Sequence, residues 1–195
     1  MILSREIVAT PIGDMVALDS GDGLCALEFL DPAQRLTRLG ARLRRYFPPH
    51  DIADRGTPTT ARTRAWLEAY FAGASADISD LPIDMRGATF EKQVWVALRT
   101  IPIGETTSYG AIARALGSAG AARAVGAANG ANPIAIIVPC HRVIGASGSL
   151  IGYGGGLDRK TWLLDHERRW RRQPQPSLFH SLWTRGPACE EIDSD

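Results

Sequence analysis

A cysteine and a histidine stand next to each other at Cys140 and His141, directly after the apolar run at 134–138. A free thiol has a pKa of about 8.5 and is mostly protonated at neutral pH, whereas the thiolate is the form that attacks carbon. A neighbouring imidazole can accept the thiol proton. The dipeptide alone leaves two interpretations open: an activated nucleophile, or an inert core cysteine beside a surface histidine.

The segments around this pair predict the elements that position it. The run IAIIV at 134–138 follows Asn132 and predicts a buried β-strand that ends at the cysteine. Further on, WLLDHE at 162–167 predicts an apolar helix that presents one carboxylate inward, from either Asp165 or Glu167. Taken alone, Glu167 is by default interpreted as a surface carboxylate.

Three helices are predicted before the cysteine, at 89–100, 109–116 and 121–130. Thr107 and Ser108 can cap the second helix, and Gly117 allows a tight turn into the third. The outline resembles a helix-turn-helix, although any small helical bundle has such corners.

The helix at 121–130, AARAVGAANG, consists mainly of alanine and glycine and carries a single charge, Arg123. Residues this small bury little apolar surface and let a backbone approach its neighbour closely. The helix is therefore either a tightly packed interior helix or one that enters a DNA groove with Arg123 projecting.

The first 85 residues predict a different unit. Three β-prone runs at 6–10, 14–20 and 24–30 are separated by turn sequences, which indicates a small antiparallel sheet. Two helices follow, one after Asp31 and one at 60–72. The predicted fold is α/β (α+β): an N-terminal sheet with helices, and a mainly helical, winged-helix-like C-terminal part. The predicted domains are 1–85 and 86–167, with a tail at 168–195.

Composition excludes several classes of protein. The 195 residues are 45% apolar and 22% charged, as in ordinary globular chains rather than disordered or collagen-like ones. No apolar run approaches the ~20 residues of a membrane span, and the first residues do not read as a secretory signal. Three cysteines without a CxxC pair favour free thiols, so we expect a cytoplasmic protein.

The net charge of +1 hides an uneven distribution. Residues 1–85 carry nine basic and twelve acidic side chains, whereas 86–167 carry eight and five. This mild basic excess in the second block permits contact with a polyanion without requiring it.

Three segments together resemble the O6-alkylguanine-DNA alkyltransferases, which repair DNA once per molecule: TTSYGAIARALG, AARAVGAANGANP and NPIAIIVPCHRVIGASGSLIGYGGGLDRKTWLLDHE. The resemblance covers about residues 86–167, while the first 85 match only in their pattern of elements. It favours the nucleophile interpretation of the Cys–His pair.

The resemblance implies roles for individual residues. Cys140 would accept the alkyl group, and His141 would act as its base through a bridging water. Glu167 would orient that histidine, Tyr109 would donate a hydrogen bond or proton to the departing guanine, and Asn132 would tie the third helix to the nucleophile segment.

The resemblance also implies a set of DNA and base contacts on double-stranded DNA that contains alkylated guanine. Arg123 would fill the stack after the damaged nucleotide is rotated out of the duplex, from a helix in the minor groove. The remaining expected contacts are Ala121, Ala122, Ala127, Arg142, Val143, Tyr153, Gly154 and Gly155. The glycines there could alternatively form a plain flexible turn.

We expect no cofactor and no metal site, because Cys25 and His50 are the only typical zinc ligands in the first 85 residues. We expect a monomer with no membrane contact.

In the tail, QPSLF, from Gln175 to Phe179, resembles the short peptide by which bacterial repair proteins dock on the sliding clamp. The basic run at 168–172 either extends the last helix toward phosphate or is a solvated end.

Three functional classes compete. The first is a single-turnover alkyltransferase acting on O6-alkylguanine, and on O4-alkylthymine if its pocket allows. The second is a non-catalytic binder of damaged DNA, and the third is a Cys–His hydrolase. Relatives of the second kind lack the acceptor cysteine that is present here, and a hydrolase would leave Arg123 and the helix-turn-helix without a purpose.

Overall fold

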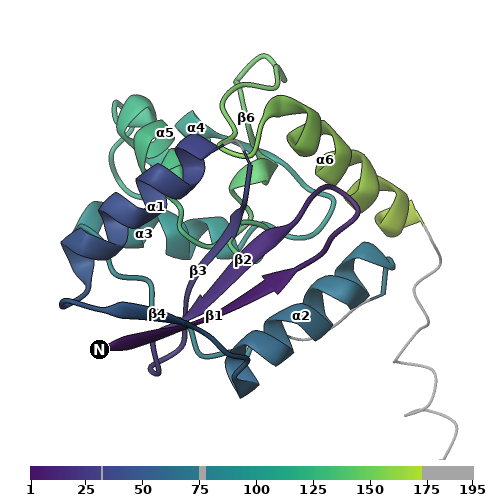
Figure 1. The fold of residues 1–195 in the computed structure, drawn as a ribbon. Coiled ribbons are helices and arrows are strands. Elements are labelled where there is room, and N and C mark those ends of the chain that lie inside the picture. Colours follow the sequence, from purple (N-terminus) through teal and green to yellow (C-terminus); the bar gives the residue numbers. More distant parts are fainter. Residues whose placement is uncertain (32, 75–77, 173–195) are drawn as a thin grey trace, which may run out of the picture.

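The computed structural model describes residues 1–31, 33–74 and 78–172. Its first half is built on a four-stranded sheet with the order β3-β2-β1-β4 (Figure 1). The strands are β1 (Ile2–Val8), β2 (Met15–Asp19), β3 (Leu24–Phe29) and β4 (Asp51–Asp54).

The three predicted strands are confirmed as an antiparallel set, but the sheet as a whole is mixed. β4 pairs in parallel with β1, so that Ile2 lies opposite Asp51. Sequence reasoning missed β4 because DIAD is short, mostly exposed and lacks the apolar alternation of a half-buried strand.

Helices cover both faces of this sheet, which explains why every residue of β2 is buried. Val16 and Leu18 pack on one face with Leu39 and Leu43 of α1 (Ala33–Tyr46). On the other face, Met15 and Ala17 belong to a core that includes α2 (Pro58–Phe71) and the second half of the chain. Side chains alternate along a strand, so one strand contributes to both layers.

Helix α2 begins two residues earlier than predicted. The Thr57 hydroxyl accepts a hydrogen bond from the Thr60 amide at 3.1 Å, and Pro58 occupies the first turn. A threonine cap followed by proline is a favoured helix start, and this pair marks the start better than the apolar periodicity does.

The second half is mainly helical, as predicted. It contains α3 (Thr89–Arg99), β5 (Thr107–Ser108), α4 (Tyr109–Ala115), α5 (Ala122–Gly130), the 3-10 helix η1 (Cys140–Arg142), β6 (Val143–Ile144) and α6 (Leu157–Arg172). Ser108 caps α4, and Gly117 turns the chain toward α5 with a φ of 73°. None of the helices in the described residues is long and apolar enough to span a membrane.

The predicted strand at 134–138 is wrong. Only Ile134 forms a β-bridge, to Leu27, and the rest of the run is a buried turn in which Ile136 has a φ of 68°. The apolar composition reflects burial of all five residues rather than strand pairing. A short apolar run does not distinguish these two cases.

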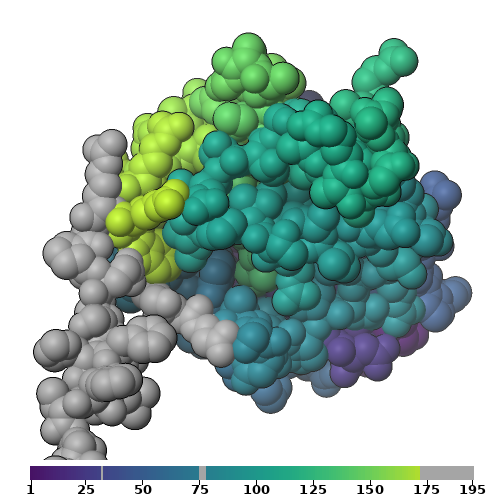
Figure 2. All heavy atoms as spheres, turned by 180° about the vertical axis from the view of Figure 1, so that it is seen from behind, coloured from purple at the N-terminus to yellow at the C-terminus, as the bar shows by residue number. Residues whose placement is uncertain are grey.

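The two halves share one core. Trp95 of α3 lies within it and donates through Nε1 to the Ala128 carbonyl of α5 at 2.8 Å. β3 meets the nucleophile segment where the Ala135 amide donates to the Leu27 carbonyl at 2.8 Å. Seen from behind, one continuous face is formed mainly by the teal and green residues of the second half (Figure 2).

Helix α6 crosses the predicted boundary at 167, because it continues to Arg172. The basic run at 168–172 therefore belongs to the last helix, and Arg168, Arg169 and Arg171 are exposed on it. Contact of this run with phosphate stays a prediction. Gln175 to Phe179 lie outside the described residues.

Candidate active site

Cys140 is the first residue of η1 and is 6% exposed. Its amide donates to the Val138 carbonyl at 2.8 Å, and its carbonyl accepts from Nδ2 of Asn129 at 3.3 Å. Asn129 belongs to α5, so a hydrogen bond joins the backbone of the cysteine directly to that helix. The turn at 134–138 and η1 thus hold Cys140 next to α5.

Asn132 lies between α5 and the nucleophile segment. Its Nδ2 donates to the Val138 carbonyl at 2.8 Å and to the Ile134 carbonyl at 3.2 Å, while its Oδ1 accepts from the Ile134 amide at 3.0 Å. A single buried amide therefore satisfies three backbone groups of a turn that forms no regular ladder. These bonds hold the irregular segment ahead of Cys140 in one shape.

His141 and Glu167 form a fully buried pair. His141 Nε2 lies 2.8 Å from Glu167 Oε1, and neither side chain is exposed. The other ring nitrogen, Nδ1, has no hydrogen-bond partner among the described residues. Because the carboxylate occupies Nε2, Nδ1 is the nitrogen left to accept a proton. Asp165, the rival carboxylate, lies at the surface and pairs with Arg168.

Arg142 corrects an expectation, because it does not face outward toward DNA. Its side chain is buried, and Nε and Nη2 each donate to a Glu167 oxygen at 2.9 Å. Its Nη1 donates to the Ile101 carbonyl at 2.5 Å. The guanidinium therefore forms a bidentate ion pair with the buried Glu167 carboxylate and is not available to contact DNA.

Tyr70 completes this carboxylate cluster, defined here as Tyr70, His141, Arg142 and Glu167. The Tyr70 hydroxyl donates to Glu167 Oε1 at 2.7 Å from α2, in the N-terminal half. The Gly104 amide also donates to Oε2, at 3.1 Å. Although burial alone would raise the pKa of Glu167, its bonds to His141 and Arg142 hold that pKa far below its usual range.

Burial leaves the base neutral and the nucleophile protonated. Burial lowers the pKa of His141 below 6.5, and the attraction of Glu167 only partly opposes this. Burial raises the pKa of Cys140, while the Asn132 amide and the Arg35 charge oppose the rise. The resting pair is therefore a thiol and a neutral imidazole, suited to proton transfer during the reaction rather than to a standing thiolate.

Cys140 opens into a cavity of about 260 Å³, referred to below as the thiol cavity. Its lining comes from α1, α4, α5 and the loop before α6: Arg35, Arg38, Tyr109, Gly126, Asn129, Gly130, Asn132, Cys140, Gly152, Tyr153 and Gly154. The structure therefore brings Cys140, Tyr109, Asn132, Tyr153 and Gly154 together, as the resemblance implies.

Two tyrosines face this cavity. The Tyr109 hydroxyl donates to the Ile151 carbonyl at 3.2 Å, and burial raises its pKa, so it remains a proton donor at neutral pH. Tyr153 stands edge-on to the His141 ring at 6.4 Å between centroids. Its hydroxyl is buried and has no partner among the described residues, which leaves a polar group at the cavity for a ligand.

Val143 and Gly155 lie behind the lining rather than in it. Val143 is fully buried in β6, directly after η1. Gly155 is buried against Phe29, where a Cβ atom would come within 3.0 Å of that ring. Both residues support the wall of the thiol cavity from inside the core.

Helix α5 presents a surface of small residues. Arg123, Ala127 and Gly130 are exposed, and Ala121 and Ala122 are half-buried, whereas Val125, Ala128 and Asn129 face the core. A second hollow of about 580 Å³ runs between α5 and the loop before α6 and includes Arg123 in its lining. This outer groove and the thiol cavity share Tyr109, Gly126 and Gly152, so the two spaces adjoin.

Lys160 of α6 fixes both ends of the loop at 144–151. Its buried Nζ donates to the Val143 carbonyl at 2.6 Å, to the Ile151 carbonyl at 2.7 Å and to the Gly152 carbonyl at 3.3 Å. All three ammonium donors are thereby satisfied in the interior.

Sequence reasoning missed Tyr70, Arg35, Glu28, Asn129 and Lys160. Asn129 stands inside the AANGANP segment and could have been found there, because asparagine is uncommon in a buried helix face. The others come from segments distant in sequence, and nothing in their local patterns indicates this site.

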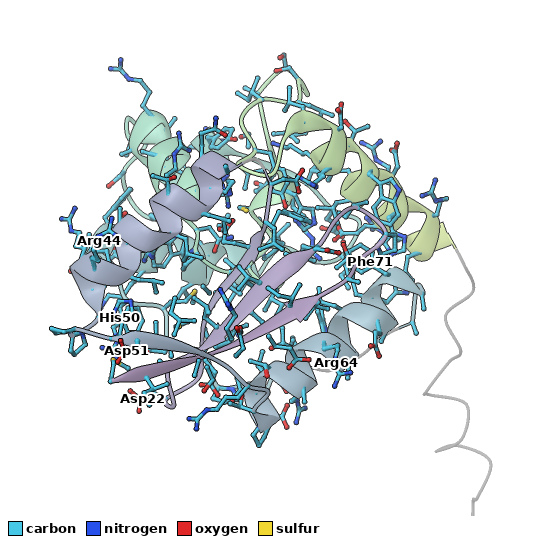
Figure 3. The ribbon with its side chains drawn as sticks, viewed as in Figure 1. Asp22, Arg44, His50, Asp51, Arg64 and Phe71 are labelled. Atoms are coloured by element: carbon cyan, nitrogen blue, oxygen red, sulfur yellow. The ribbon has the colours of Figure 1, made fainter. Side chains whose placement is uncertain are left out.

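The two zinc-type ligands of the first half occupy different environments. Cys25 is buried in β3, and burial raises its pKa to about 12. His50 is partly exposed, near the edge of the molecule, and its Nδ1 lies 2.9 Å from the Pro48 carbonyl (Figure 3). Within the described residues, no group of three or more potential metal ligands is present.

Two family models match the chain. "6-O-methylguanine DNA methyltransferase, ribonuclease-like domain" covers residues 3–85, and "6-O-methylguanine DNA methyltransferase, DNA binding domain" covers residues 89–169. Among curated relatives, a methylated-DNA–protein-cysteine methyltransferase of Mycolicibacterium paratuberculosis is 53% identical over 152 residues, covering 78% of this chain and 90% of the relative. One from Shigella flexneri is 43% identical over 166 residues, covering 85% and 95%.

Solved structures agree with this assignment. The O6-methylguanine methyltransferase of Mycobacterium tuberculosis matches with a TM-score of 0.71 and 44% identity, covering 88% of this chain and 95% of that one. The structure of the same organism's protein described as OGT in complex with DNA matches with a TM-score of 0.69 and 42% identity, covering 87% and 94%. On the fold, the site and these likenesses, the chain belongs to the 6-O-methylguanine DNA methyltransferase family.

Proposed function

We propose that this protein repairs DNA by direct reversal: it moves the alkyl group from O6 of an alkylated guanine to the sulfur of Cys140, once per molecule. The observation that carries this proposal is the position of Cys140. A protonated thiol, next to a neutral histidine held by a buried carboxylate, opens into a cavity that adjoins the surface of α5. The names of the relatives support the same reaction.

The thiol proton passes to Nδ1 of His141, in the family through a water, and Glu167 stabilises the imidazolium that forms. The Cys140 sulfur bonds to the alkyl carbon as the bond from that carbon to O6 breaks. The electron pair goes to the guanine, which receives a proton or hydrogen bond from Tyr109.

The product is a thioether, and water does not cleave a carbon–sulfur bond of this kind under mild conditions. A thioester keeps a carbonyl that water can attack, but an S-alkyl cysteine offers no such group. Each molecule is therefore consumed by one reaction, which distinguishes this protein from a Cys–His hydrolase.

DNA is the proposed partner, through α5. Its small residues allow the backbone to lie close to the minor groove, where shape dominates recognition. The outer groove leads from Arg123 to the thiol cavity, so a nucleotide rotated out of the duplex would enter past Tyr109 and Gly126. Arg123 would then occupy the vacated place in the base stack. A relative of known structure was solved in complex with DNA.

The remaining proposals concern localisation, oligomeric state, a second substrate and a protein partner. We place the protein in the cytoplasm, acting as a monomer, without a cofactor or metal. O4-alkylthymine is a further candidate substrate, and docking on a sliding clamp through the segment from Gln175 to Phe179 is a separate proposal. Phe179→Ala should abolish retention by immobilised clamp, and equal retention would reject that docking.

Intact mass spectrometry tests the main proposal. The protein is incubated with a duplex containing O6-methylguanine, beside an undamaged duplex as control. We expect a gain of one methyl group per chain, located on Cys140 by peptide mapping. Cys140→Ser should take up no methyl while it retains affinity for the duplex.

Each other result selects a competing function. Binding of damaged duplex with no adduct would indicate a non-catalytic lesion binder. Removal of many methyl groups per chain would indicate turnover and hence hydrolase chemistry. A Cys140→Ser protein that still repairs the oligonucleotide would reject Cys140 as the acceptor.

A further inference from the structure

Arg35 belongs to α1 in the N-terminal half, yet its side chain lines the thiol cavity together with Cys140 and Tyr153. The side chain is only 11% exposed. No feature of the LDPAQRLTRL segment indicates such a position, and the reaction proposed above does not use this residue.

The guanidinium of Arg35 is held from two sides. Its Nε donates to Glu28 Oε2 at 2.7 Å, and its Nη2 contacts the same oxygen. Glu28, on β3, is itself 6% exposed. On the other side the guanidinium lies directly on Gly154, where any Cβ atom would overlap it. The charge is therefore fixed in place rather than solvated at the end of a flexible chain.

The position of the pair favours an effect on the thiol. Arg35 lines both the thiol cavity and a neighbouring cavity of about 380 Å³, whereas Glu28 lines only the neighbouring one. The positive member therefore borders the same cavity as the sulfur, whereas the negative member does not. Both charges act on the Cys140 thiol: Glu28 raises its pKa and Arg35 lowers it. A fixed charge in a poorly solvated site acts more strongly than a charge in water.

The other cations near this site are less suited to that effect. Lys160 directs its ammonium to three backbone carbonyls, and Arg42 donates to the carbonyls of Ala131 and Arg86. Arg38 lines the thiol cavity but is exposed to solvent, which screens its charge.

We propose that Arg35, aligned by Glu28 and seated on Gly154, stabilises the negative charge that develops in the thiol cavity when Cys140 gives its proton to His141 and the guanine departs. The N-terminal half would thereby contribute one side chain to the chemistry of the C-terminal half. This inference rests on the alkyl transfer proposed above.

The first measurement needs no DNA. The rate at which iodoacetamide alkylates Cys140 is followed against pH, with the Cys140 peptide quantified by mass spectrometry so that Cys25 and Cys189 do not interfere. Arg35→Met removes the charge and should raise the apparent thiol pKa by about one unit, a tenfold loss of thiolate at a given pH. Arg35→Lys should restore most of it.

Glu28→Gln gives the decisive contrast. Burial raises the pKa of Glu28 to about 7, so the carboxylate is negatively charged over the higher pH range in which the thiol titrates. The substitution removes this charge but keeps an oxygen that accepts the guanidinium N–H. We expect it to lower the apparent pKa of Cys140, opposite to Arg35→Met. Arg44→Met, on the same helix but pointing away from the molecule, should leave that pKa unchanged (Figure 3). Mere disruption of α1 would move both pair variants in the same direction.

The second measurement is the single-turnover rate of methyl transfer at saturating damaged duplex. Arg35→Met should slow this rate about tenfold without weakening duplex binding, and Arg35→Lys should recover it. An unchanged thiol pKa in Arg35→Met, an unchanged transfer rate, or equal shifts in Arg35→Met and Glu28→Gln would overturn the inference. A wild-type protein that takes up no methyl would instead reject the proposed function, and the thiol titration would still report on Arg35.

Discussion

Among the residues that the structure describes, two cysteines are buried, one in each half, and they differ in whether their surroundings allow chemistry. Cys25 is in β3, surrounded by the residues that pack α1 on the sheet, and Cys140 begins η1 at the end of the turn at 134–138. Burial raises the pKa of both thiols. Burial and protonation therefore do not distinguish a nucleophile from a core residue.

The difference lies in what surrounds each sulfur. Cys140 has a cavity in front of it, a neutral histidine beside it in sequence, and a carboxylate cluster that holds that histidine. The charged groups that act on Cys25 include the carboxylates of Asp84 and Asp19, which raise its pKa further. A reactive thiol is thus recognised by a proton acceptor and an open approach, not by its own exposure.

The largest effect is expected when the carboxylate cluster is broken. Glu167→Ala leaves the buried Arg142 charge and the His141 ring without their partner. Removal of one member of a buried ion pair costs about 3–5 kcal/mol of unfolding free energy. Urea titration should show this loss, whereas Cys25→Ala should cost far less. Equal losses would mean that the cluster contributes no more to stability than an ordinary core side chain.

Glu167→Gln tests the chemistry of the cluster rather than its packing. The amide keeps the shape but cannot stabilise a positively charged His141, so single-turnover methyl transfer should slow by at least about a hundredfold. Folding, checked by circular dichroism, should persist. Slow iodoacetamide labelling of Cys25 should not change, since no base acts there. A normal transfer rate would show that His141 works without the carboxylate.

Acid pH should expose the same cluster. The pKa of His141 in the folded protein lies below 6.5. Below about pH 6.5 this histidine is therefore protonated in the unfolded chain but still neutral in the folded one, so the free energy of unfolding falls. Glu167 adds a loss at lower pH, because its depressed pKa stabilises the fold only while it stays ionised. Glu28 acts in the opposite direction, because burial raises its folded pKa to about 7 and its protonation stabilises the fold as the pH falls toward 4.5. The contribution of His141 is therefore measured as a difference between variants in urea titrations from pH 7 to pH 4. His141→Gln should lose less stability than the wild type between about pH 6.5 and 5, and identical pH profiles would assign the wild-type slope to other groups.

The smallest effect is expected at Cys25. Cys25→Ala removes one buried sulfur and should lower the unfolding free energy by about 1 kcal/mol. The rate and stoichiometry of methyl transfer should match those of the wild type, because Cys25 is not among the residues that line the thiol cavity. A protein that loses its methyl uptake with Cys25 would remove the contrast between the two thiols.

The sequence predicted the parts of this molecule that depend on local pattern. The helices around Gly117, the first three strands and the Cys140–His141 pair each follow from neighbouring residues, and the structure confirms the fold they make. The preference for Glu167 over Asp165 came from the family pattern rather than from periodicity. In the structure it is Glu167 that lies beside His141.

The errors share a physical cause: contacts between segments distant in sequence decide these conformations, and no local pattern contains those contacts. The IAIIV run is apolar because it is enclosed on all sides, and it turns instead of extending. Arg142 was expected at DNA because the resemblance placed it among the DNA contacts, yet it is neutralised by a carboxylate 25 residues later. Tyr70 and Arg35 approach the site from segments about 70 and 105 residues away, and no window of the sequence brings such residues together.

Lys160 has a consequence for the variability of the chain. Its ammonium group donates hydrogen bonds to the carbonyls of Val143, Ile151 and Gly152 and so joins the two ends of the loop at 144–151. The tip of this loop, at 146–149, is exposed. The tip is thereby uncoupled from the reacting sulfur. Insertions or exchanges at 147–149 can accumulate over evolution, or be introduced by design, while the bonds of Lys160 preserve the geometry beneath. Ala146 is not part of this variable stretch, because it lines the outer groove.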